Sequence, residues 1–254
     1  MKATAEPDGT TGTVVRWAAR VAAVSSAVTV SGMVATPLLP QGGLGRRLLS
    51  TEVDGGVNAT TTANAQRVGT RTGMPFGRYA YTEALRPQVA HVPVIVPLAW
   101  FGMGLPAREA ATAALGGQST AASRIALGSV AMTAWDLFLD PQMVGEGYWR
   151  WARRGVYRGI PLSNYAGWLL TGVGIMALFE ALLPSTTRSV ADGQFERHAP
   201  SGDVRLVGEY GYMSVMQTLG FARYFRDPLV AAVGGAAMLP ISAAAVRGLV
   251  AGRR

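Results

Sequence analysis

Long stretches without any charged residue constrain this chain more than any other feature of its sequence. Four such stretches run from Val21 to Gly45, from Pro87 to Ala107, from Gly159 to Phe179 and from Pro228 to Val246. Each is close to or longer than the roughly 20 residues that a helix needs to cross a ~30 Å hydrocarbon layer. Only 15% of the 254 residues are charged, against about 25% in soluble domains. The pattern predicts a membrane protein rather than a soluble enzyme or a disordered chain.

Two further segments are less uniform. Ile125–Trp149 has no basic residue but holds three carboxylates, and Tyr210–Ala222 is a short run that either extends back through Val204–Val207 or forms a core or re-entrant segment. The run that begins at Val21 is the weakest, because it is rich in Ser, Thr and Gly, and it is interpreted as a signal-anchor or first transmembrane helix. We therefore expect an all-α fold, a polytopic integral membrane bundle of about five to seven transmembrane helices.

Composition excludes several kinds of site. The chain has no cysteine, which removes thiol nucleophiles and Cys-based zinc sites, and His91 and His198 lie far apart in the sequence, so no metal site is expected. The net charge is +8, but the arginines are scattered between apolar runs and form no basic patch of the kind that binds nucleic acid. We expect no nucleic-acid partner.

Three carboxylates interrupt an otherwise span-like segment, TAWDLFLDPQMVGEGYWRW (133–151). Asp136 and Asp140 are four residues apart, so a helix places them on one face, and Glu146 follows shortly after. Ionisable groups inside a span are costly and are functional-site hypotheses by default. Burial and like-charge proximity favour the protonated form of one carboxyl group. A neutral acid beside an ionised one is an acid/base pair that can protonate a substrate and then activate water.

Pro141 follows directly after the second aspartate. It removes a backbone donor and is expected to kink or end the helix, which frees a carbonyl near Leu137 and opens a polar pocket. Structural alternatives remain: the aspartates pair with an arginine from another span, or they cap a kinked helix. A magnesium-pyrophosphate site of the prenyltransferase kind needs a second Asp-rich motif, and the other carboxylates are isolated.

Other polar and aromatic residues are weaker candidates. Asn164 begins the third charge-free run and either hydrogen-bonds a catalytic carboxylate or serves in helix contacts and capping. Tyr79 and Tyr81 have strand-like or turn spacing and either line a site or anchor at the interface. Gln217 is a candidate pocket donor, and His91 is interpreted as structural. Four further aromatics next to basic residues predict an interface belt: Tyr148, Trp149, Trp151 and Tyr157.

The sequence resembles the CruF-type carotenoid biosynthesis membrane proteins, which include carotenoid 1,2-hydratases. The resemblance covers about Gly69 to Val246. It is carried above all by the block around AWDLFLDPQM, and also by GMPFGRYAYTEAL (73–85), VPVIVPLAWFGMGLPA (92–107), YRGIPLSNYAGWLLTG (157–172) and, more weakly, MQTLGFARYFRDP (216–228). Residues 67–254 are accordingly expected to form the carotenoid-biosynthesis domain. Residues 1–66 depart from the family pattern and are expected to hold one weak transmembrane segment, at about 21–39, and a polar loop.

The resemblance implies a reaction. Such hydratases add water across the terminal C=C of an acyclic carotenoid ψ-end without a cofactor; lycopene-like, γ-carotene-like and C50 bisanhydrobacterioruberin ends are family substrates. It places acid and base on Asp136 and Asp140, with Glu146 as a third catalytic candidate. Substrate-binding candidates are Tyr79, Tyr81, Asn164, Trp135 and Tyr165, of which the last two are expected to stabilise a cation.

The implied setting is the cell membrane of a prokaryote, with the lipid bilayer, a lipophilic carotenoid and other carotenoid-biosynthesis enzymes as partners. Three alternatives stay open. One is a non-catalytic membrane subunit of a carotenoid-modifying complex, and another is a prenyltransferase-like or cyclase-like carotenoid enzyme. The third, a proton-coupled transporter, would need acids on more than one span, whereas here they cluster on one.

Overall fold

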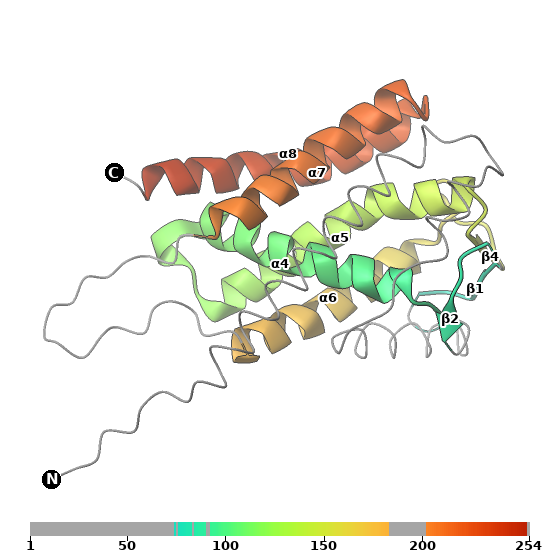
Figure 1. Cartoon of the computed structure of the whole chain (residues 1–254), viewed down its shortest axis with the longest axis horizontal. Helices are drawn as coiled ribbons and strands as arrows, with labels where there is room; N and C mark the ends of the chain where they lie inside the picture. The colour runs from blue at the N-terminus through green and yellow to red at the C-terminus, as the bar shows by residue number, and fades with distance from the viewer. Residues whose placement is uncertain (1–73, 75, 83, 90–91, 183–201, 253–254) are drawn as a thin grey trace, which may run out of the picture.

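Five α-helices make up most of the part of the chain that the structure describes (Figure 1). The structure is a computed structural model, and it describes residues 74, 76–82, 84–89, 92–182 and 202–252. The segment expected at 21–39, His91 and His198 lie outside the described residues. The helices are α4 (Ile95–Leu115), α5 (Ala121–Gly145), α6 (Leu162–Leu182), α7 (Val204–Arg223) and α8 (Pro228–Ala251), with a short 3-10 turn, η2 (Gly116–Gln118), between α4 and α5.

Each charge-poor segment within the described residues contains a helix, but the ends differ from the expectation. The run that begins at Pro87 starts with a hairpin of two short antiparallel strands, β2 (Gln88–Val89) and β3 (Val92–Pro93), so its helix starts at Ile95 and continues past Arg108. The short run at 210–222 does extend back to Val204, as one of the alternatives proposed. The helical class of the fold is confirmed for the described residues.

Of the helices in the described residues, two are long and apolar enough to cross a membrane: α6, over Leu162–Ala181, and α8, over Pro228–Ala251. Both also carry large apolar side chains on the outside of the bundle, among them Leu170 (66% exposed) and Val250 (53% exposed). Exposed apolar surface of this kind suits contact with lipid or with another protein better than contact with water. The expected bundle of five to seven transmembrane helices stays a prediction.

Helices α4 and α5 lie between the α7/α8 pair on one side and α6 on the other (Figure 1). Glycines permit the closest approaches. A Cβ atom at Gly234 of α8 would stand 2.5 Å from the ring of Phe138 on α5, and one at Gly248 would stand 1.8 Å from the carbonyl oxygen of Ala113 on α4. Helix α8 therefore packs directly against both central helices.

An antiparallel ribbon closes one end of the bundle (Figure 1). It pairs β1 (Tyr79–Tyr81) with β4 (Trp149–Trp151), and the register sets Tyr79 opposite Trp151 and Tyr81 opposite Trp149. Alternate residues of a strand point to the same face, so the four aromatic side chains share one face of the ribbon. Ala80 and Arg150 oppose one another on the other face.

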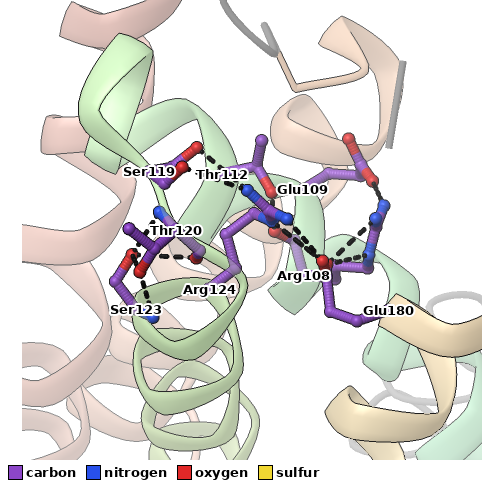
Figure 2. Close-up of polar contacts among 8 residues, drawn as sticks. All are labelled: Arg108, Glu109, Thr112, Ser119, Thr120, Ser123, Arg124 and Glu180. Carbon is purple, nitrogen blue, oxygen red and sulfur yellow. Dashed lines mark hydrogen bonds and ion pairs between the residues drawn. The ribbon is translucent and has the colours of Figure 1, made fainter. Parts of the chain in front are cut away.

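A buried ion cluster joins the helices near their other ends (Figure 2). Glu180 of α6 accepts hydrogen bonds from Arg108 of α4, at 3.2 Å to Nε, and from Arg124 of α5, at 2.5 Å to Nη2. Arg108 also pairs with Glu109 at 2.5 Å, and Glu109 accepts the backbone N–H of Asp203 at the start of α7. These side chains are 8–14% exposed. The cluster therefore joins α4, α5 and α6 by ion pairs and the start of α7 by a backbone hydrogen bond.

Candidate active site

Asp136 and Asp140 lie on one buried face of α5, as their spacing predicts. They are 1% and 3% exposed. One side-chain amide joins them: Nδ2 of Asn164, on α6, donates to Oδ2 of Asp136 at 3.2 Å and also to Oδ2 of Asp140. Of the two alternatives for Asn164, the structure therefore supports a hydrogen bond to the carboxyl pair.

No arginine among the described residues pairs with either aspartate. The buried arginines of the bundle, Arg108 and Arg124, instead bond glutamates of the ion cluster. Two carboxyl groups held together without a countercharge, in a site this dry, are expensive to ionise together. One proton shared between them removes the like-charge repulsion. The pair can therefore present an acid and a base side by side.

Helix α5 continues through Pro141 to Gly145, so of the two expected effects of the proline, a kink or an end of the helix, the second is wrong. Proline has no N–H for the carbonyl four residues earlier, which is that of Leu137. That oxygen accepts a hydrogen bond from the hydroxyl of Tyr157 at 2.9 Å instead. Burial, and then the negative charge of Asp227, raises the pKa of Tyr157 to about 12, so its hydroxyl keeps its proton and remains a donor.

A narrow pocket opens at the carboxyl pair, and aromatic side chains form most of its wall. Its volume of about 10 Å³ gives room for about one water molecule, and it is partly open to the outside. The indole rings of Trp100 and Trp168 stack in this wall with centroids 3.8 Å apart. The pocket is lined by Tyr79, Tyr81, Val96, Trp100, Asp136, Asp140, Trp149, Trp151, Asn164 and Trp168.

The ribbon supplies four of these aromatic residues. Tyr79 and Tyr81 therefore contribute to the pocket wall, one of the two roles considered for them. Burial raises the pKa of both phenols above its usual value, so both stay neutral. Neutral phenols can donate a hydrogen bond or present a ring face to a substrate without adding charge.

Three of the candidate site residues lie outside the pocket lining. Trp135 is fully buried and packs edge-on against Trp100, behind the wall. Tyr165 turns its ring toward Tyr157, with centroids 5.9 Å apart, although its buried hydroxyl has no hydrogen-bond partner among the described residues. Glu146 forms the C-terminal cap of α5. Gln217, the additional pocket donor considered, is buried in α7 and also does not line the pocket.

Sequence reasoning missed four tryptophans of the wall. Trp149 and Trp151 were interpreted as an interface belt, whereas the structure pairs their strand with β1 and turns them to the pocket. A signal was available, because W-R-W at 149–151 has the same alternation as Y-A-Y at 79–81. Trp100 and Trp168 gave no such signal, since single tryptophans in apolar runs are common core residues.

A metal site is a separate question. Within the described residues, no group of three or more His, Asp or Glu side chains is arranged to hold an ion. The carboxyl pair and Asn164 offer oxygen atoms from only one helix and an amide that points its nitrogen, not its oxygen, at the carboxyl groups.

Comparison with known proteins places the chain in a family. No solved structure matches it. A bisanhydrobacterioruberin hydratase of Haloarcula japonica is 36% identical over 115 residues, an alignment that covers 44% of this chain and 39% of that protein. The chain thus spans well under half the length of this relative. The model of the carotenoid biosynthesis protein family matches residues 22–224, which include both ribbon strands, the carboxyl pair and Asn164. The chain therefore belongs to the carotenoid biosynthesis protein family.

Proposed function

We propose that this protein is a carotenoid hydratase. It adds water across the terminal C1=C2 double bond of an acyclic ψ-end and produces a tertiary alcohol, without a cofactor. One observation carries the proposal: two buried carboxyl groups share one amide donor in an aromatic-walled pocket with room for about one water molecule. Hydratase activity in the Haloarcula japonica relative supports the same reaction class.

The acid, base and aromatic groups that hydration requires are all present in the pocket. Adding water to an alkene causes no net oxidation or reduction, so an acid and a base suffice. Protonation at C2 leaves positive charge on C1, and water then attacks that carbon. One carboxyl group supplies the proton and the other receives a proton from the water. Faces of aromatic rings such as Trp100 and Trp149 stabilise the cation by roughly 0.5–2 kcal/mol each.

A lipophilic substrate explains the apolar outer surface. A polyene dissolved in a bilayer reaches the pocket from its open side without passing through water. Helices α6 and α8 present apolar side chains outward and are long enough to span the membrane. We place the protein in the cell membrane of a prokaryote, where other enzymes of carotenoid biosynthesis supply its substrate.

The test is expression in two pigment-producing bacterial hosts, one that makes lycopene and one that makes bisanhydrobacterioruberin. Pigments are separated by chromatography, and their molecular masses are measured by mass spectrometry. We expect a gain of one water per ψ-end in at least one host. Asp136→Asn and Asp140→Asn should each lower the hydration rate by about 10²–10⁴-fold, the usual contribution of a general acid or base.

A matched control removes a carboxylate elsewhere. Asp203 caps α7 through its side chain, and Asn caps helices equally well, so Asp203→Asn should keep full hydration. Unchanged pigment in both hosts, with folded protein in the membrane, overturns the proposal and favours a non-catalytic subunit. Pigment that is altered without gaining water overturns it in favour of a cyclase-like or prenyl-transferring enzyme.

A further inference from the structure

The two aspartates are chemically unequal in this pocket. We infer that Asp136 is the proton donor, that Asp140 is the base that activates water, and that Asn164 is the positioning residue that keeps the two roles apart. The inference rests on the proposed hydration reaction and assigns a role to each member of the pair.

Hydrogen-bond donors are distributed unevenly between the carboxyl groups. The amide of Asn164 has two hydrogens and directs its nitrogen to both aspartates, but the contact to Asp136 is the long one, at 3.2 Å. Asp140 lines the same pocket, and neither of its oxygens is among the buried polar atoms that lack a hydrogen-bond partner within the described residues. Asp140 is thus the member of the pair without an unpartnered buried oxygen, and it is the group that the site stabilises as an anion.

Asp136 has an oxygen that lacks a donor. Within the described part of the chain no hydrogen bond reaches its Oδ1, although the residue is only 1% exposed and lines the pocket. A buried carboxylate oxygen without a donor carries a large desolvation cost, whereas the protonated group does not need one. The proton of the pair is therefore held by Asp136, which lines the pocket.

With these roles, every bond and proton in the hydration step is accounted for. The π electrons of C1=C2 form a C2–H bond with the proton of Asp136, which leaves Asp136 ionised and C1 positive. A lone pair of the water oxygen forms the C1–O bond, and one water proton passes to Asp140. The two carboxyl groups lie on one face of α5 and accept from the same amide nitrogen, so the proton on Asp140 returns to Asp136 within the pair. The pair ends each cycle with the charge and proton count with which it began.

Deuterium incorporation distinguishes the proton donor from the base. Membranes from the host in which the wild-type chain hydrates its carotenoid are suspended in D2O, and the recovered pigment is analysed for deuterium and oxygen. In Asp140→Asn the acid still forms the cation but water is not activated. The cation therefore loses a proton back to Asp136, and the unhydrated alkene should carry deuterium at C2. In Asp136→Asn no cation forms, so the alkene should gain neither deuterium nor oxygen.

Other patterns overturn the assignment. The assignment of acid and base is overturned if the alkene gains deuterium in Asp136→Asn alone, in both variants or in neither variant. Hydration by the wild-type chain would still uphold the proposed function in each of these cases. Absence of wild-type hydration defeats the proposed function instead, so the two failures are distinguishable. If an Asn variant does not accumulate, Asp140→Ser and Asp136→Ser, which are smaller, answer the same question.

The role of Asn164 has its own readout. Asn164→Ala should raise the ratio of deuterium exchange to hydration at least several-fold, because the cation forms while the base is no longer held in place. The matched control is Ser163→Ala, in the same helical turn, whose hydroxyl makes only a long 3.4 Å contact to the Phe76 carbonyl and does not line the pocket. If Asn164→Ala lowers hydration but leaves the ratio of deuterium exchange to hydration unchanged, Asn164 has only a structural role. That result would overturn its assignment as the positioning residue.

Discussion

At the scale of single residues, the site depends on a proline that helix α5 tolerates. Pro141 directly follows Asp140 and removes the donor that the Leu137 carbonyl would otherwise have, and Tyr157 replaces it from outside the helix. The substitute bond allows the helix to continue to Gly145, so that both aspartates stay in regular helical register. The proline therefore couples the 157–160 turn to the carboxyl pair.

This coupling predicts a measurable penalty. Tyr157→Phe leaves the Leu137 oxygen without a donor and should lower the free energy of unfolding by about 1–3 kcal/mol. Thermal melting of the detergent-solubilised protein measures it. In a Pro141→Ala background the restored backbone N–H can serve Leu137, so the same change should cost much less. Tyr212→Phe, at an exposed position of α7, is the control. Equal penalties in both backgrounds would contradict the coupling.

The carboxyl pair was predictable from sequence, and its environment was not. Spacing of four residues on a helix fixes that Asp136 and Asp140 share a face, whatever the tertiary packing. Asn164 was a candidate because an amide at the start of an apolar run can hydrogen-bond a carboxylate of a neighbouring helix. That it donates to both aspartates depends on how α6 packs against α5, and no local pattern specifies that packing.

At the scale of elements, close helix contacts depend on glycines. Gly248→Ala places a methyl group against the Ala113 carbonyl of α4, where a Cβ would be 1.8 Å away. Because the obstacle is backbone, α8 must move, and we expect a loss of about 1–3 kcal/mol or more in stability. Gly208→Ala, where a Cβ meets nothing, should be neutral or stabilising by up to about 1 kcal/mol. Melting temperatures that fall equally in both variants would refute the packing argument.

Among the helices and strands, some could be predicted from the sequence and others could not. Charge-free runs located α6 and α8 well, because those helices carry apolar side chains on their outer surface and few charges. The ribbon was missed because its strands are three residues long and their partners lie about seventy residues apart in the chain. Periodicity over three residues is too short to distinguish a strand from a loop. Four of the six aromatic residues of the wall come from this ribbon, so most of the wall takes shape only when β1 and β4 are paired.

At the scale of the whole molecule, the ion cluster and the carboxyl pocket lie at different levels along the same three helices. Helix α5 carries Arg124 near its start and Asp136 twelve residues later, a separation of about 18 Å along the axis. Helix α6 carries Asn164 near its start and Glu180 near its end, and α4 carries Trp100 in the pocket wall and Arg108 two turns later. The ion cluster therefore holds the helices together at a distance from the pocket.

Removing one charge of the cluster should harm stability more than removing a pair. Glu180→Met leaves Arg124 without its carboxylate and should lower the free energy of unfolding by on the order of 3 kcal/mol. In Arg124→Met with Glu180→Met the remaining cation, Arg108, still pairs with Glu109, so the loss should be smaller. Melting in detergent measures stability, and hydration per folded molecule should stay near the wild-type value in both variants. A double variant less stable than Glu180→Met alone would contradict this account.

The ribbon at the pocket has a consequence for how the chain can be divided. β1 precedes the α4–α5 connection at Gly116–Gln118, and β4 follows it, so a cut there leaves one strand on each fragment. The first fragment keeps α4, and all the helices that α4 contacts belong to the second. The two halves, produced together from separate genes, should therefore assemble, co-purify through a tag on either one and restore hydration. Fragments that fail to associate would show that the covalent connection, rather than the pairing of β1 with β4, holds the site closed.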